Sequence, residues 1–152
     1  MPVHLDTDFL VVALASNGCE RRRLTELAES AAEIQISAVA WYEFARGPRT
    51  PEQLAVARSF FFDDGIVPFS EELATLAAEV FRTLGSPRRR AADVAIGVTA
   101  ASMGALLLSR NAADFAGIPK LQLEATTDYP LLRTRRQTEA GGDIGPWRSV
   151  WP

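Results

Sequence analysis

The strongest signal in the chain is the stretch Ser37-Ala38-Val39-Ala40-Trp41-Tyr42-Glu43-Phe44-Ala45-Arg46-Gly47-Pro48. Ser37 suits a helix N-cap and Gly47-Pro48 suits a helix end, so the pattern predicts a helix between them. One face of that helix forms a stripe made of Val39, Ala40, Glu43, Phe44 and Gly47. Such a stripe should face a core, where an unpaired carboxylate is very costly. Glu43 therefore needs an arginine, a proton or a metal ion beside it.

Short apolar runs surround that helix and recur along the chain. They predict five strands, at 3–5, 34–36, 66–68, 105–108 and 121–123. Helical spacing predicts further helices over 9–14, 20–31, 52–62, 70–84 and 91–103, with a helical turn over 111–115. Apolar strands that alternate with helices are typical of a parallel sheet covered on both faces. We therefore expect an α/β fold with a central parallel sheet of about five strands.

The composition is that of a globular protein with a core. The 152 residues are 47% hydrophobic and 23% charged, which fits one compact domain. Periodicity fades late in the chain, so we expect a folded domain over 1–125. The tail over 126–152 should be extended, or packed on the domain or a partner. No apolar run could cross a membrane and the N-terminus does not look like a signal peptide, which favours a cytoplasmic protein. The single cysteine, Cys19, excludes an internal disulfide and a thiolate zinc cluster.

Three further acids stand where they could meet Glu43. Asp6 follows the first strand and Asp114 follows the 105–108 strand, and parallel sheets bind ligands beyond the carboxyl ends of their strands. Asp93 heads a helix stripe made of Asp93, Ile96, Gly97, Ala100 and Gly104, whose small residues predict close packing against the sheet. Taken alone, each of these three acids also suits a cap, a turn or a helix dipole. Glu43 lies mid-helix and caps nothing.

Carboxylates that converge on one point repel one another, unless a cation, shared protons or arginines neutralise them. An oxygen-rich site with no cysteine and one histidine suits Mg²⁺ or Mn²⁺. Such an ion can polarise a phosphodiester and lower the pKa of a bound water. The acids therefore favour metal-dependent cleavage of phosphodiester bonds.

Other polar residues near these acids are auxiliary candidates. Ser109 and Asn111 could assist, and Asp8 could bind a metal through water, although a helix-start role is the better interpretation of Asp8. His4, the only histidine, lies inside an apolar strand and is predicted to be a packed core residue.

The arginines are grouped, although the net charge of −3 excludes a generally cationic nucleic-acid binder. Local basic runs can still hold phosphates, because such binding depends on nearby arginines rather than on total charge. The runs that lie beside the acids are predicted to bind substrate phosphates. They contain Arg88, Arg89, Arg90 and Arg110.

These residues resemble the motifs of the PIN-domain family, in particular the VapC-type toxins of prokaryotic toxin–antitoxin pairs. The matching pieces are Leu5-Asp6-Thr7-Asp8, Ser37-Ala38-Val39 leading to Glu43 and Gly47, Asp93-Val94-Ala95-Ile96, and Leu106-Leu107-Leu108-Ser109-Arg110-Asn111 with Asp114-Phe115. The resemblance covers most of the chain, from Val3 to Leu123.

The resemblance implies a three-layer α/β/α fold, so that 1–125 would be a PIN-like nuclease domain using Mg²⁺ or Mn²⁺ to cleave RNA internally. It implies that Asp6, Glu43, Asp93 and Asp114 are the catalytic, metal-binding acids, with Asn111 or Ser109 assisting. It also implies inhibition by a cognate antitoxin, and frequent homodimers.

Two alternatives remain at this stage. Asp6-Thr7-Asp8 after a first strand also suggests a haloacid-dehalogenase-like phosphatase, but the sole lysine, Lys120, follows every candidate acid. The second alternative is a catalytically silent PIN-like module that binds RNA or protein. The apolar residues 60–62, with Trp147 and Trp151, are further predicted to mark a dimer or antitoxin surface.

Overall fold

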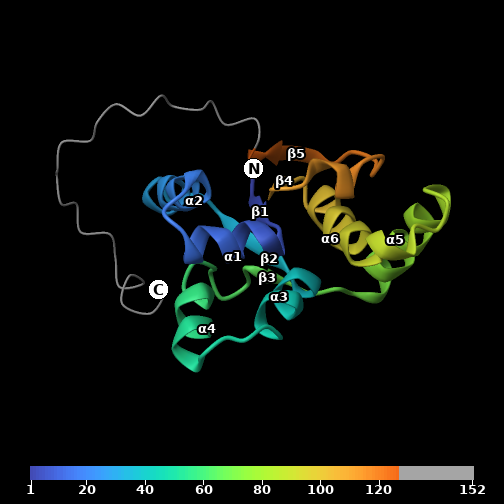
Figure 1. The fold of residues 1–152 in the computed structure, drawn as a ribbon. Helices are drawn as coiled ribbons and strands as arrows, with labels where there is room; N and C mark the ends of the chain where they lie inside the picture. Colours follow the sequence, from blue (N-terminus) through green and yellow to red (C-terminus); the bar gives the residue numbers. More distant parts are fainter. Residues whose placement is uncertain (127–152) are drawn as a thin grey trace, which may run out of the picture.

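A computed structural model describes residues 1–126 (Figure 1). In chain order the elements are β1 (Val3–Leu5), α1 (Thr7–Ala15), α2 (Cys19–Glu29), β2 (Ile34–Ser37), α3 (Ala38–Ala45), α4 (Pro51–Arg58), β3 (Ile66–Val67), α5 (Glu71–Thr83), η1 (Arg88–Arg90), α6 (Ala91–Ser102), β4 (Leu106–Ser109), η2 (Ala112–Phe115) and β5 (Gln122–Ala125), where η marks a 3₁₀ helix. None of the helices in this part of the chain is long and apolar enough to span a membrane. The predicted tail lies outside the described residues from residue 127 onward.

The five predicted strands are confirmed and form one parallel sheet in the order β3-β2-β1-β4-β5. β1 is central: Val3 pairs with Ile34 of β2 on one flank and with Leu106 of β4 on the other. Every residue of β1 and β2 is buried, including the polar residues His4, Gln35 and Ser37, as expected for strands that are covered on both faces. Because all strands run the same way, their carboxyl ends lie at one edge of the sheet.

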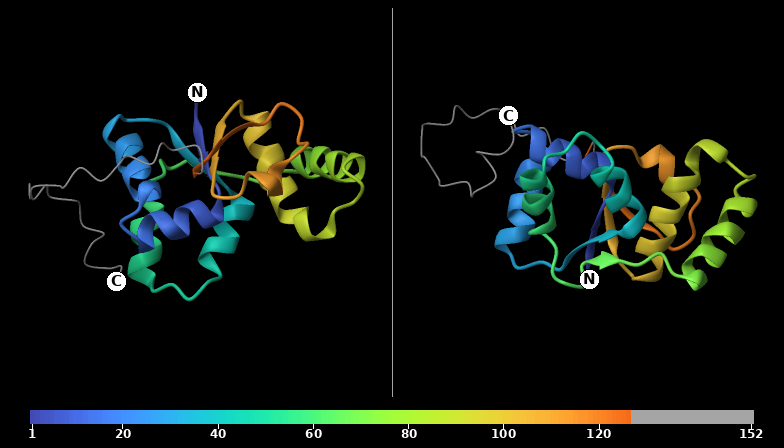
Figure 2. Two further views of the ribbon diagram at one scale, coloured as in Figure 1. Left: turned by 45° about the horizontal axis from the view of Figure 1, so that its top comes forward. Right: turned by 90° about the horizontal axis from the view of Figure 1, so that it is seen from below.

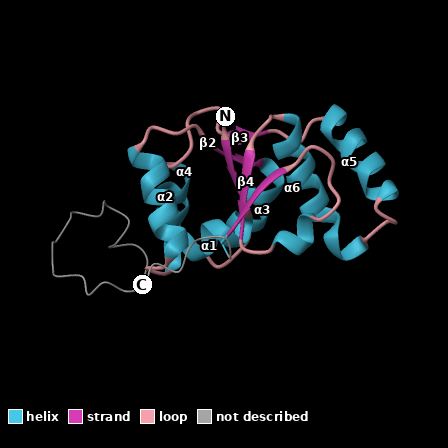
Figure 3. Cartoon of the chain, turned by 90° about the horizontal axis from the view of Figure 1, so that it is seen from above, coloured by secondary structure: helices cyan, strands magenta, loops and turns pink. Residues whose placement is uncertain are grey.

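Helices cover both faces of the sheet, which confirms the three-layer α/β/α prediction (Figures 2 and 3). Helices α1, α2 and α4 lie on one side, and α5 and α6 lie on the other. Helix α3 contacts both α1 and α6, so it connects the two outer layers. This position brings the residues of α3 close to the starts of helices from both sides.

Local signals set most helix ends. The Ser37 hydroxyl accepts a hydrogen bond from the Ala40 amide at 3.1 Å, which starts α3 as predicted. Gly104, at φ +63°, ends α6 as predicted. The predicted helix over 52–62 was too long, because α4 ends at Arg58. The guanidinium of Arg58 donates to the carbonyls of Phe61 at 2.8 Å and Phe62 at 3.0 Å and closes the chain into a turn.

Helix α6 packs tightly against its neighbours at Gly97. A Cβ at this glycine would lie 2.5 Å from Ile118 Cδ1 and 3.2 Å from Phe115 Cδ1. The predicted close packing of this helix is therefore directed at the segment between β4 and β5, in addition to the sheet. Phe115 and Ile118 are both buried, so η2 is fixed against α6 by apolar contact.

Candidate metal centre

Four acids reach the carboxyl edge of the sheet from separate elements. Asp6 follows β1, Asp114 lies in η2 just after β4, and β1 and β4 are neighbouring strands. Glu43 comes from α3 and Asp93 from the first turn of α6, and these two helices contact each other. We call Asp6, Glu43, Asp93 and Asp114 the acidic cluster.

Asp6 is the most buried member of the acidic cluster, with 6% of its surface exposed. Its Oδ1 accepts from the Thr7 amide at 2.8 Å, and its Oδ2 accepts from the Ser109 hydroxyl at 2.9 Å. Burial raises the pKa of Asp6 to about 6, and the nearby charges of Asp8 and Glu43 add to the rise. The hydrogen bonds from Ser109 and Thr7 oppose it, because they favour the ionised form. Asp6 therefore caps α1 and belongs to the cluster at once.

The pKa of Asp93 is raised by burial and by the negative charges of all the other acids at this edge. Burial raises the pKa of Asp93 most, followed by the negative charges of Asp114, Asp6, Glu43 and Asp8, and together they bring it to about 7. Like charges disfavour ionisation only when they lie close enough to act through a poorly screened medium. The four elements therefore place their carboxylates close enough for the negative charges to interact.

Glu43 is half-buried and accepts a hydrogen bond from the Thr7 hydroxyl at 3.2 Å. That hydroxyl also lies 3.3 Å from the Ala40 carbonyl. Among residues 1–126, no arginine or lysine forms an ion pair with Glu43, so a guanidinium does not explain its place on the stripe. Sequence reasoning missed Thr7 as a functional candidate. The available signal was a hydroxyl residue between two acids at a strand end.

A hydrogen-bonded chain connects the two acids at the strand ends. The Ser109 hydroxyl donates to Asp6 and accepts from the Asn111 amide at 3.0 Å. The Asn111 side-chain amide donates to Asp114 Oδ2 at 2.7 Å. Both auxiliary candidates therefore orient carboxylates of the cluster, while Asp8 is exposed on the first turn of α1.

The four predicted substrate-binding arginines differ in their surroundings. Arg90 donates from Nε to the Asp114 carbonyl at 2.8 Å and from Nη2 to the Ala116 carbonyl at 2.6 Å. Arg110 forms an ion pair with Glu20, with Nε 3.4 Å from Oε1. Arg88 and Arg89 are exposed, and their role in holding substrate stays a prediction. The guanidinium of Arg90 is therefore engaged with backbone carbonyls, and a role for Arg90 in holding substrate also stays a prediction.

The donor set of the cluster fits a hard divalent ion. It offers only oxygen and excess negative charge, and no ion pair neutralises these acids within the described part of the chain. Within that part, no three acid, histidine or cysteine side chains are arranged to hold a metal by themselves. This finding does not conflict with the pKa shifts, because charges act over longer distances than ligand bonds. Mg²⁺ commonly binds through one or two carboxylates and keeps several waters, so it does not require three protein ligands at one point.

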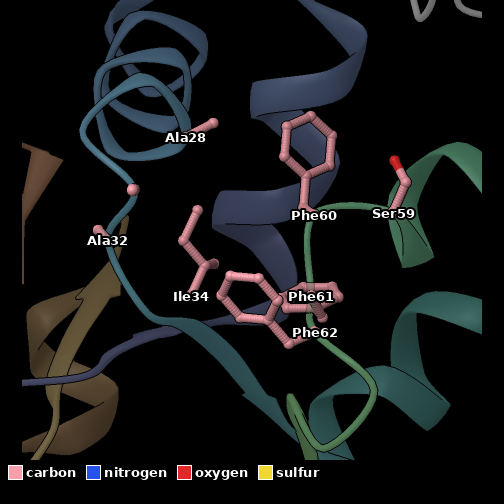
Figure 4. A pocket seen from close by; sticks show the side chains of 8 residues that line it. Ala28, Ala32, Ile34, Ser59, Phe60, Phe61 and Phe62 are labelled. Carbon is pink, nitrogen blue, oxygen red and sulfur yellow. The ribbon is translucent and has the colours of Figure 1, made fainter.

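An apolar pocket of about 310 Å³ lies away from the acidic cluster (Figure 4). The end of α2, the start of β2 and the segment after α4 line it with Ala28, Ala31, Ala32, Ile34, Ser59, Phe60, Phe61 and Phe62. The predicted exposed patch at 60–62 is only partly present. Phe62 is 62% exposed, but Phe61 is buried at 5%. Trp147 and Trp151 lie outside the described residues.

Solved structures share this fold. VapBC2 from Rickettsia felis, bound to a DNA fragment from its promoter, is 22% identical with a TM-score of 0.63, over 82% of this chain and 98% of that one. A toxin–antitoxin complex from Klebsiella pneumoniae is 26% identical with a TM-score of 0.58, over 81% and 96% of the two chains. FitAcB from Neisseria gonorrhoeae is 21% identical with a TM-score of 0.60, over 80% and 95%.

No curated protein matches the chain significantly. The family model of the PIN domain, by contrast, matches residues 3–121, which include the whole acidic cluster. That match separates the chain from the phosphatases that Asp6-Thr7-Asp8 alone also suggests. With most of its length covered, the chain belongs to the PIN domain family.

Proposed function

We propose that this protein is a metal-dependent endoribonuclease and the toxin of a prokaryotic toxin–antitoxin pair. One observation carries the proposal: the pKa of Asp93 is raised to about 7, in part by the charges of Asp114, Asp6 and Glu43. A protein that needed these acids only as helix caps would have no reason to crowd them together. The crowding is favourable when a divalent cation is bound among them.

The chain's own residues supply orientation and charge at this edge. Ser109 and the Thr7 amide hold the two oxygens of Asp6, and the Thr7 hydroxyl holds Glu43. Asn111 holds Asp114 in the same way. Mg²⁺ or Mn²⁺ bound by the acidic cluster would supply positive charge to a scissile phosphate and acidify water beside it. The exposed Arg88 and Arg89 would attract the backbone phosphates of RNA.

The similar solved structures support an antitoxin as the protein partner. The Rickettsia felis and Klebsiella pneumoniae structures are toxin–antitoxin complexes, and the first of them also contains DNA. We therefore propose a cognate antitoxin as the protein partner and RNA as the substrate. We propose further that the protein forms a homodimer and acts in the cytoplasm.

The decisive experiment incubates the protein with RNA and either Mg²⁺ or Mn²⁺, beside Asp93→Asn and a sample with chelator. We expect internal cleavage by the wild type, and loss of cleavage in both other samples. Equal cleavage by wild type and Asp93→Asn would refute the catalytic role of the cluster. RNA binding without any cleavage would favour the alternative, a catalytically silent RNA-binding module.

A further inference from the structure

Arg90 connects the two elements that carry Asp93 and Asp114. It is the N-cap residue of α6, three positions before Asp93 in the first turn of that helix. Its guanidinium reaches across to η2 and donates to the carbonyls of Asp114 and Ala116. One side chain therefore connects the backbone that carries Asp93 to the backbone that carries Asp114.

The short helix η2 needs such a contact, because its own hydrogen bonds are long. The Asp114 amide lies 3.3 Å from the Asn111 carbonyl, and the Ala116 amide lies 3.3 Å from the Ala113 carbonyl. Carbonyls at the end of a short helix have no partner within the helix. Arg90 satisfies two of them with bonds of 2.8 Å and 2.6 Å, which are shorter than the bonds within η2 itself.

The orientation of Arg90 also leaves Asp93 available. Residues three apart on a helix are neighbours, so an arginine at 90 could have paired with the carboxylate at 93. Within residues 1–126 there is no such ion pair, and the charge of Arg90 is not among the causes of the shifted Asp93 pKa. The guanidinium is instead directed to backbone carbonyls.

We propose that Arg90 is a positioning residue for metal binding, which fixes the separation of Asp93 and Asp114 by clamping η2 to the start of α6. The inference rests on the proposed function, because it assumes that the cluster binds a divalent ion. It differs from the sequence-based prediction that Arg90 holds substrate phosphate.

Loss of the Arg90 charge and loss of its positioning contacts should change the metal affinity in opposite directions. Removal of a positive charge near the acids would by itself tighten the binding of a cation. Loss of positioning would weaken it, and outer contacts that orient metal ligands typically contribute about 10- to 100-fold in affinity. We therefore expect Arg90→Ala to weaken Mn²⁺ binding by about 10-fold or more. The titration follows the electron paramagnetic resonance signal of free Mn²⁺ and requires no RNA.

Arg89→Ala is the matched control. Arg89 belongs to the same basic run and is exposed, and removing it deletes the same charge without touching η2. We expect it to leave Mn²⁺ affinity equal or slightly tighter and to raise the KM for RNA. We expect Arg90→Ala to lower kcat at subsaturating Mn²⁺ instead. Arg90→Lys keeps the charge but loses the two-pronged donor, so it should resemble Arg90→Ala and provides a second variant if Arg90→Ala does not fold.

The outcomes separate the two proposals. Unchanged or tighter Mn²⁺ binding in both Arg90 variants, with a raised KM for RNA, would overturn the positioning role and restore the phosphate-binding one. Full recovery by Arg90→Lys would show that the two-pronged guanidinium contact with η2 does not set the metal affinity, which also overturns it. A wild-type protein that binds no Mn²⁺ would overturn the proposed function itself, and the inference with it.

Discussion

Two regions of the molecule differ in whether their charged side chains have partners within the fold. In the first, each charged group has a partner: Arg21 donates to the carbonyls of Ala13 and Leu14, and Arg23 Nε lies 3.1 Å from Glu124 Oε2. We call this the paired region, and it consists of Glu20, Arg21, Arg23, Arg110 and Glu124. The acidic cluster gathers charges of one sign, and no ion pair neutralises them within the described residues.

The difference distinguishes charges that the fold itself neutralises from charges that we propose to bind a metal ion. Paired groups are satisfied by the folded chain alone, so their contribution is to stability. Crowded acids lower the stability of the chain alone and are satisfied only when something binds. The comparison therefore predicts that substitutions in the two regions have effects of different kinds.

The largest effect should follow the loss of a carboxylate from the acidic cluster. We expect Asp6→Asn to lower the rate of RNA cleavage by about 100-fold or more, because a direct metal ligand should matter at least as much as its outer contacts. The measurement is the initial rate of RNA cleavage at saturating Mn²⁺. Asp63→Asn removes the same charge from an exposed turn and should leave the rate unchanged. Similar losses in both variants would mean that net charge, not the site, is responsible.

A structural effect should dominate in the paired region. Arg21 is buried, and Arg21→Met would leave the carbonyls of Ala13 and Leu14 without this donor. We expect a loss of about 2–4 kcal/mol in the free energy of unfolding, because each unsatisfied buried group costs about 1–3 kcal/mol. Urea denaturation gives the value. The folded fraction should still bind Mn²⁺, and a variant that kept full stability but lost metal binding would erase the distinction between the two regions.

A smaller effect should appear in the pH dependence of the stability of the metal-free protein. The folded pKa of Asp93, about 7, lies above its ordinary value of 3.8. The folded protein therefore holds a proton that the unfolded chain has released, and stability falls as pH rises from about 4 to 7. Asp93→Asn should reduce this fall and raise the Tm of the metal-free protein at pH 7.5 by about 2–4 °C. Thermal melts across pH would show it, and Mn²⁺ should stabilise the wild type more than the variant.

The smallest effect should come from the Arg110–Glu20 ion pair, in which the arginine side chain is 47% exposed. Exposed ion pairs contribute about 0–1 kcal/mol, so Arg110→Ala should change stability by about 0.5 kcal/mol. A simultaneous rise in the KM for RNA would sharpen the comparison, because it would show that Arg110 also serves the substrate. A loss above 2 kcal/mol would place this pair among the main structural contacts.

The sequence was most informative where one residue type decided the outcome. The five strands were predictable because short segments with apolar residues alternate with helical patterns, and the start of α3 because Ser37 is an N-cap. The end of α4 was not predictable, because the side chain of Arg58 closes the turn that follows it. Contacts of this kind cannot be predicted from the local pattern of residues in the sequence.

The candidate site divides in the same way. Glu43 was recognisable as an anomaly on an apolar stripe, and Asp6 by its place after β1. Their hydrogen-bond partners were harder to predict, because Thr7 meets Glu43 across 36 positions. Arg90 reaches the Asp114 carbonyl across 24 positions, and nothing in its basic run distinguishes it from its neighbours. Partners of this kind follow only from the assembled fold.

The central place of β1 has a consequence for biosynthesis. Asp6 is synthesised well before its partner, because the Ser109 hydroxyl that holds it comes 103 positions later, on a strand that also completes the flank of β1. Contacts between such distant segments form late in folding. The acids can therefore gather only after the ribosome has added the segment that carries Ser109 and Asp114.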